Sequence, residues 1–211
     1  MIARSMRRNG LILAVFAMLA TLLIVVIAKL TEAPIQRQQE AELLRVLNEI
    51  IPARAHDNDL YASCTQLNVP ELGSKPQRAY RAWLNGEPQA LAITVTAPDG
   101  YSGAIQLMVA IQYDGSVAGV RTLAHAETPG LGDKIERRKS DWIDSFQGLT
   151  VNGSDDPRWA VKRDGGIFDQ FTGATITPRA VVSAVEEAVL SFQANRDSWF
   201  AAPSNCWETT S

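Results

Sequence analysis

The chain has 211 residues, with 20 basic and 23 acidic side chains and a formal net charge of −3. This length suits one domain of ordinary size plus an appendage. The basic residues form no large cluster outside the N-terminus, which argues against a nucleic-acid-binding surface. The two cysteines lack further ligands at metal spacing, so we expect no metal site.

The first element is an apolar run over residues 10–28, in which Thr21 is the only mildly polar side chain. About 20 such residues span a bilayer, and a charge at the centre, which would cost about 2.5–3.5 kcal/mol, is missing. Basic residues precede the run, namely Arg4, Arg7 and Arg8. The positive-inside rule therefore predicts a cytoplasmic N-terminus. A cleaved signal peptide is the alternative, but the run is longer than usual and lacks an Ala-x-Ala site before Thr31.

These observations predict four parts. They are a cytoplasmic N-terminus (1–9), a transmembrane helix (10–29), a connecting part (30–76) and the main domain (77–211). In a bacterium, the chain would be a single-pass protein of the inner membrane with its main domain in the periplasm.

The connecting part begins with a predicted amphipathic helix over 35–51, ended by Pro52. Its apolar positions follow helical spacing: Leu43, Leu44, Leu47, Ile50 and Ile51. Polar residues, Gly and Pro over 53–76 predict loops. His56 lies there among charged residues, and we expect a solvated side chain rather than a ligand.

Two β-hairpins are predicted next. Residues 79–84 and 91–96 flank Asn85-Gly86, and residues 103–113 and 117–123 flank Asp114-Gly115. A helix over 135–146, with Trp142 and Ile143 as packing residues, and a short strand over 159–161 should follow. The last predicted helix, 178–192, carries a core-facing stripe: Val181, Val182, Val185, Val189 and Phe192.

The two cysteines, Cys64 and Cys206, leave two possibilities open. In an oxidising compartment they would form one disulfide that closes a long loop, worth up to ~5 kcal/mol. Otherwise they are two buried, unpaired thiols.

Two stretches are equipped to hold a ligand. Residues 169–178 lead into the last helix, where Pro178 suits the first helical position and Thr177 the cap. A phosphate is favoured at such a helix start, and the threonine hydroxyls could bind it or be bonded to it. Residues 125–135 combine two Gly and a Pro with a carboxylate, a hydroxyl and an ammonium group. Taken singly, each stretch is also compatible with an ordinary turn.

Together the two stretches resemble a known family. Asp169-x-x-Thr172-Gly173-Ala174-Thr175 resembles the flavinylation motif Asp-x-x-Ser/Thr-Gly-Ala-Thr of the FMN-binding domain family. His125-x-Glu127-Thr128-Pro129-Gly130-Leu131-Gly132 resembles the loop that faces the flavin in that family. With the single anchor, most of the chain resembles the G subunits of Rnf electron-transport complexes. These are related to the C subunits of sodium-pumping NADH:quinone oxidoreductases.

The resemblance implies an α+β fold: one N-terminal transmembrane helix, then an extracytoplasmic FMN-binding domain of antiparallel sheet flanked by helices. It implies FMN bound covalently through a phosphoester to Thr175, installed by a separate Mg-dependent flavin transferase. Asp169 would serve recognition or activation of the hydroxyl, and Thr172, Gly173 and Ala174 complete the motif. The implied flavin contacts from the other loop are Glu127, Thr128, Leu131, Gly132 and Lys134. His125 would either bond the flavin edge or serve the structure.

The leading functional hypothesis is an electron-carrying subunit of a membrane complex that couples electron flow between ferredoxin and NAD to ion movement. Its partners would be the other membrane and iron–sulfur subunits, and we expect no catalytic residues because the flavin carries the redox chemistry. A C subunit of the sodium-pumping enzyme ranks lower, because the chain is short for that subunit. A non-redox, membrane-anchored assembly module is the third hypothesis. No nucleophile elbow supports a hydrolase.

Overall fold

The computed structural model describes residues 2–207, without the side chains of residues 2–5, 33 and 36. It divides into two compact units, Met1–Leu43 and Leu44–Ser211. Helix α1 (Ile2–Ile50) begins in the first unit and ends in the second. The predicted boundary before residue 35 is wrong, since the helix runs on through Pro34. Strong helix formers such as Glu, Gln, Ala and Leu follow Pro34 and outweigh the one backbone hydrogen bond that proline removes.

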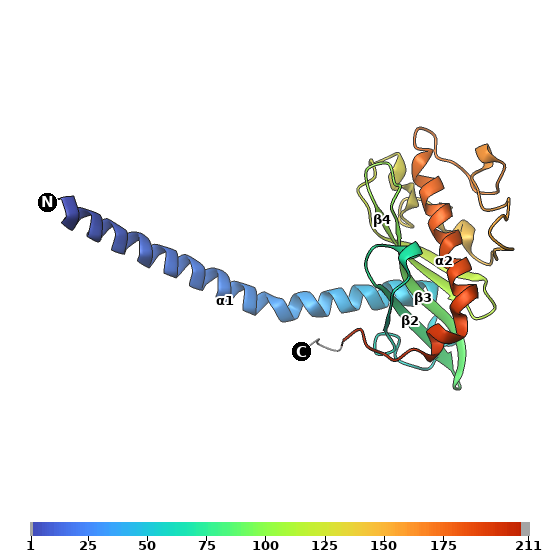
Figure 1. Cartoon of the computed structure of the whole chain (residues 1–211), viewed down its shortest axis with the longest axis horizontal. Helices are drawn as coiled ribbons and strands as arrows, with labels where there is room; N and C mark the ends of the chain where they lie inside the picture. The colour runs from blue at the N-terminus through green and yellow to red at the C-terminus, as the bar shows by residue number, and fades with distance from the viewer. Residues whose placement is uncertain (1, 208–211) are drawn as a thin grey trace. The chain divides into compact units, whose positions relative to one another are not determined.

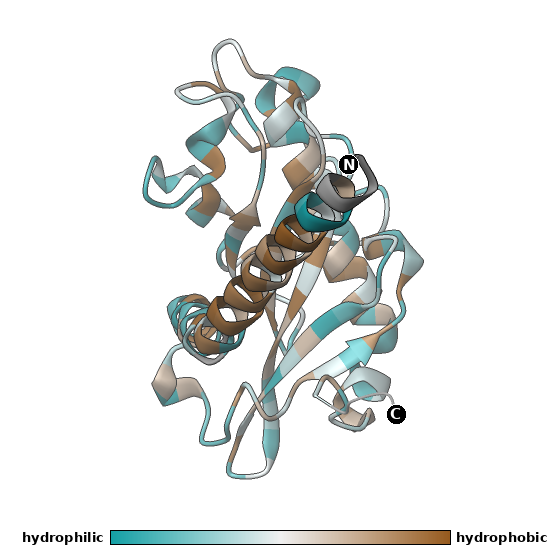
Figure 2. Cartoon of the chain, turned by 90° about the vertical axis from the view of Figure 1, so that its left-hand side faces the viewer, coloured by the Kyte–Doolittle hydropathy of each residue, from teal (hydrophilic) through white to brown (hydrophobic). Residues whose placement is uncertain are grey.

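The first unit carries the apolar run. Figure 2 shows this part of α1 as a continuous hydrophobic stretch that follows a hydrophilic turn near the N-terminus. The apolar side chains from Leu11 to Leu30 are exposed in the structure of the chain alone. Within the described residues, α1 is the one helix long and apolar enough to span a membrane.

The second unit is built on a five-stranded antiparallel sheet in the order β1-β2-β3-β4-β5 (Figure 1). The strands are β1 (Thr65–Leu67), β2 (Gln77–Leu84), β3 (Glu87–Ala97), β4 (Ile105–Gln112) and β5 (Val117–Ala124). Both predicted hairpins are confirmed. Asn85 and Gly86 have positive φ angles of 54° and 81°, which a two-residue turn between twisted strands requires.

Side chains cover both faces of the sheet. Helix α2 (Ile176–Ala201) packs its predicted stripe, including Val185 and Phe192, against the alternate residues of β3 and β4 that share one core cluster. On the opposite face the C-terminal turns of α1 approach closely, since a Cβ on Gly119 would lie 3.0 Å from the Ile50 side chain. Burial on both faces explains why β4 is almost continuously apolar. The hydrophobic core thus holds α2 against the sheet.

Several predicted elements differ. The helix over 135–146 is instead two 3-10 helices, η3 (Gly132–Ile135) and η4 (Asp141–Phe146), because 136–140 is wholly polar and Ser140 caps η4. The predicted strand over 159–161 is reduced to a single bridge between Val161 and Phe168. The predicted loops over 53–76 contain β1 and the 3-10 helices η1 (Ala53–Ala55) and η2 (Pro70–Leu72). A fifth 3-10 helix, η5, spans Lys162–Asp164.

The C-terminal tail is fastened to the start of the sheet. Cys64 and Cys206 form a disulfide, with their Cα atoms 5.5 Å apart, which settles the alternative left open by the sequence. The buried Arg81 guanidinium donates to the carbonyls of Phe200 and Ala202. His56 is half-buried rather than solvated, since its Nδ1 lies 3.0 Å from the Asn58 carbonyl and its Nε2 is buried.

Candidate cofactor site

The flavinylation-like stretch is a tight turn that runs directly into α2. The Ala174 N–H donates to the Phe171 carbonyl (3.1 Å), and Gly173 between them has a φ of +82°. Thr175 is the N-cap residue of α2, yet its side chain makes no capping hydrogen bond, and the residue is half-buried. The Thr175 hydroxyl is therefore not used by the helix start.

The predicted capping by Thr177 is wrong. The helix begins two residues earlier than expected, so Thr177 and Pro178 are already helical. Thr177 is fully buried, and its hydroxyl donates to the Glu127 carboxylate. Pro178 still falls in the first turn, where a missing N–H has no intrahelical partner to lose.

Glu127 joins three segments of the site. The residue is 4% exposed, and its Oε1 accepts from the Ser102 N–H (3.0 Å) and its Oε2 from the Thr177 hydroxyl. Its own backbone N–H donates to His125 Nδ1 (3.0 Å). A buried carboxylate is tolerated only when its oxygens are paired in this way. Glu127 thus ties the β3–β4 loop, the loop after β5 and the first turn of α2 together.

The two motifs meet at Gly132, Leu131 and Gly173. A Cβ on Gly132 would lie 2.7 Å from Glu127 Oε2 and 2.9 Å from Thr177 Oγ1, so no larger residue fits without a shift. A Cβ on Gly173 would lie 3.3 Å from Leu131 Cδ2. The fold therefore brings the two sequence-predicted loops into contact.

The remaining loop residues divide into exposed and structural ones. Thr128 is exposed, and its carbonyl accepts from the N–H groups of Leu131 and Gly132 (3.1 Å each). Lys134 is half-buried and makes no ion pair within residues 2–207. Asp133, which the sequence did not single out, is buried and accepts from the Gly130 N–H (2.8 Å). These bonds fix the loop backbone.

Asp169 has an exposed carboxylate and a fixed backbone. Its Oδ1 lies 2.7 Å from Lys162 Nζ, and its side chain is 70% exposed. Its carbonyl accepts from the Trp142 indole N–H at 2.7 Å. Thr172 is exposed and Ala174 half-buried. The acidic group of the motif is therefore exposed, with Lys162 as its ion-pair partner.

His125 has both ring nitrogens engaged within the protein. Because Nδ1 accepts from the Glu127 N–H, the proton lies on Nε2, which faces Glu136 Oε1 at 3.0 Å. Hydrogen bonds from Arg138 and then His125 lower the pKa of the Glu136 carboxyl. These contacts favour the structural role for His125 over a bond to the flavin edge.

The residues present fit a bound flavin. Three exposed apolar side chains lie on or next to the segments that Glu127 joins: Tyr101, Leu131 and Ile176. They offer apolar surface to a planar ring, while the free Thr175 hydroxyl lies at the positive end of the α2 dipole, where a phosphate is stabilised. Sequence reasoning missed Tyr101 and Ile176, although an apolar residue within a polar turn is itself a signal.

Comparison with known proteins shows the family of the chain. The model of the FMN-binding domain matches residues 100–190, which hold both motifs and most of α2. The chain is thus a protein with an FMN-binding domain. A second model, of the RnfG N-terminal region, matches residues 1–50, which is α1.

Relatives match over nearly the whole chain. The G subunit of the ion-translocating oxidoreductase complex of Vibrio atlanticus is 52% identical over 203 residues, covering 96% of this chain and 97% of the relative. The corresponding G subunits of Shewanella piezotolerans (51%) and Vibrio cholerae (50%) match at the same coverage of 96% and 97%. The chain belongs to the family of G subunits of ion-translocating oxidoreductase complexes. It is therefore an electron-transport subunit that works with other subunits.

Proposed function

We propose that this chain carries FMN bound through a phosphoester to Thr175 and that this flavin is one relay for electrons in the complex. The observation that carries the proposal is the Thr175 hydroxyl. It lies at the N-cap of α2 without a capping role, in the turn that contacts Leu131 of the second motif. When bound, FMN supplies one- and two-electron redox chemistry.

Attachment needs an external enzyme and an activated donor. A threonine hydroxyl is a poor nucleophile without a base, and the nearby Asp169 carboxylate is exposed and paired with Lys162. Joining free FMN would expel hydroxide, so the donor must be a flavin dinucleotide. The phosphorus–oxygen bond to Thr175 Oγ forms, the phosphoanhydride bond breaks, the nucleoside monophosphate leaves, and the hydroxyl proton is released. A Mg-dependent flavin transferase performs this step.

The chain's own residues then hold the tether. The phosphodiester carries one negative charge, which the α2 N-terminus offsets by about 0.3–1 kcal/mol. Glu127, through Thr177, fixes the first turn of α2 against the loop that carries Thr128, Leu131, Gly132 and Lys134. The role of these residues is to position and enclose the flavin, and the chain needs no catalytic acid or base of its own.

In the complex, electrons pass between ferredoxin and NAD through iron–sulfur subunits and this flavin, coupled to ion movement. The α1 span would anchor the chain in the inner membrane, and the basic residues before it favour an N-terminus in the cytoplasm. The Cys64–Cys206 disulfide supports a periplasmic main domain, because disulfides persist in oxidising compartments.

The attachment is tested with Thr175→Ala and Ser183→Ala variants, co-expressed with a flavin transferase. Ser183 is the control, since its hydroxyl-bearing side chain is exposed on the same helix and lies outside both motifs. After denaturing electrophoresis, flavin fluorescence should stay with the wild type and Ser183→Ala bands and be lost from Thr175→Ala. Fluorescence that persists in Thr175→Ala would refute the attachment site. Wild-type protein that stays colourless would favour a non-redox assembly module.

The complex is tested by purifying the tagged chain with its neighbours. Cysteine-rich iron–sulfur subunits among them support the ferredoxin:NAD system. A quinone-reducing flavoprotein would instead assign the chain to the sodium-pumping NADH:quinone oxidoreductase.

A further inference from the structure

Trp142 is the residue that holds the backbone of the attachment segment. It lies on η4, far from the segment in sequence, and is 9% exposed. Its indole N–H donates to the Asp169 carbonyl at 2.7 Å, and its ring meets the Phe171 ring edge to face at a centroid distance of 5.0 Å. Trp142 therefore contacts both Asp169 and Phe171, the first and last residues of the short segment before the Phe171–Ala174 turn.

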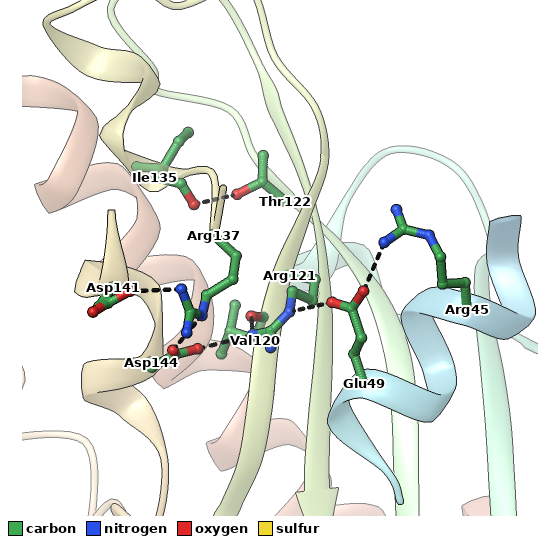
Figure 3. Close-up of polar contacts among 9 residues, drawn as sticks. All are labelled: Arg45, Glu49, Val120, Arg121, Thr122, Ile135, Arg137, Asp141 and Asp144. Atoms are coloured by element: carbon green, nitrogen blue, oxygen red, sulfur yellow. Dashed lines mark hydrogen bonds and ion pairs between the residues drawn. The ribbon is translucent and has the colours of Figure 1, made fainter. Parts of the chain in front are cut away.

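Helix η4 is itself held in place from two sides. Its buried residues Trp142 and Phe146 belong to an aromatic cluster with Phe168 and Trp159. On its outer side Asp144 accepts from Arg121 of β5 (3.0 Å), and Arg121 also donates to Glu49 near the end of α1 (2.9 Å; Figure 3). Trp142 thus lies on a helix that is connected by ion pairs to the sheet and, through Arg121, to α1.

From this geometry we infer that Trp142 is a positioning residue for FMN attachment, acting through its N–H on the Asp169 carbonyl. The inference rests on the proposed attachment to Thr175. A transferase must bring the Thr175 hydroxyl to the donor phosphorus, and a displacement of about 1 Å in such a nucleophile is costly. Without the N–H, the 169–175 backbone loses its fixed starting point, although the aromatic packing remains.

Trp159 provides a matched control. It is also buried in the aromatic cluster, and its indole N–H also donates to a carbonyl, that of Thr150 (3.2 Å). That carbonyl lies outside the attachment segment and keeps a second donor in Arg158. Trp159→Phe therefore changes the same cluster without releasing residues 169–175.

The experiment uses the full-length chain in detergent, purified without flavin and then mixed with a flavin transferase, a flavin dinucleotide and Mg²⁺. Intact mass follows loading with time, below the melting temperature of every variant. Loss of the Trp142 hydrogen bond should lower the rate of FMN loading of Trp142→Phe by about three- to tenfold. Trp159→Phe should load at a rate near that of the wild type. Benzothienylalanine at position 142, which keeps the bicyclic shape and lacks the N–H, should slow loading equally.

Hydrogen exchange of the unloaded chain gives a second readout. The amides of residues 170–175 should exchange faster in Trp142→Phe than in Trp159→Phe. Loading of Trp142→Phe at the wild-type rate, or equal slowing by Trp159→Phe, overturns the positioning role. A wild-type chain that gains no mass overturns the proposed function instead.

Discussion

At the scale of single residues, the site depends on one buried carboxylate. Glu127 accepts from the Ser102 N–H and from the Thr177 hydroxyl, while Gly132 lies close against both Glu127 and Thr177. The family motif had suggested Glu127 as a flavin contact. Its contacts in the protein show that it joins the segments that carry the exposed groups, while the flavin contact stays a prediction.

Gly132→Ala tests this packing. The added methyl group would lie 2.7 Å from Glu127 Oε2 and must push the carboxylate or the Thr177 hydroxyl away. We expect a loss of about 1–3 kcal/mol in the free energy of unfolding, measured with urea. Thr128→Ala, which shortens an exposed side chain of the same loop, should change it by less than about 0.5 kcal/mol. Equal stability of Gly132→Ala and the wild type would contradict the close contact.

At the scale of elements, hairpins and the closing helix follow from the sequence because their signals are local. The two-residue turn needs positive φ angles, which Asn85 and Gly86 readily adopt, and the apolar stripe of α2 has helical spacing. The 3-10 helices do not follow in this way. Helix η4 has a local cap in Ser140 but is also held by distant partners, the Asp169 carbonyl for Trp142 and Arg121 for Asp144.

For the site, too, the sequence predicts the local features and the fold shows the contacts between distant residues. Both motifs could be found from their residues, whereas their meeting at Leu131 and Gly173 needed the fold. Thr177 was expected to cap the helix, but a buried partner, Glu127, takes its hydroxyl. Local capping preference is worth about 1 kcal/mol, and the pairing of a buried carboxylate outweighs it.

The ion pairs at η4 give a prediction for Arg121. Its side chain is 15% exposed and donates to Glu49 and Asp144 and to the Val120 carbonyl (Figure 3). Arg121→Met should lower the free energy of unfolding by about 1–3 kcal/mol, because two partly buried carboxylates lose a partner. Arg138→Met removes an 81% exposed partner of Glu136 and should cost less than about 1 kcal/mol. Similar losses in the free energy of urea unfolding for Arg121→Met and Arg138→Met would contradict the greater contribution of Arg121.

In the whole molecule, the disulfide joins two residues of the second unit that are far apart in the sequence. Cys64 precedes β1, and Cys206 lies in the tail, where Arg81 also donates to Ala202 and Ser204. Closing a loop of this length, 142 residues in sequence separation, is worth up to about 5 kcal/mol in the chain-entropy model. Reduction should therefore lower the free energy of unfolding by several kcal/mol. A Cys64→Ala/Cys206→Ala variant should not respond to reductant, and an unchanged wild type would contradict the stabilising role.

Covalent FMN on Thr175 is tested by the intact mass of the full chain expressed with and without a flavin transferase, followed by peptide mapping. We expect an added mass of one esterified FMN only in the presence of the transferase, located on the peptide with Thr175. An unchanged mass, or a flavin located on any other residue, would contradict it.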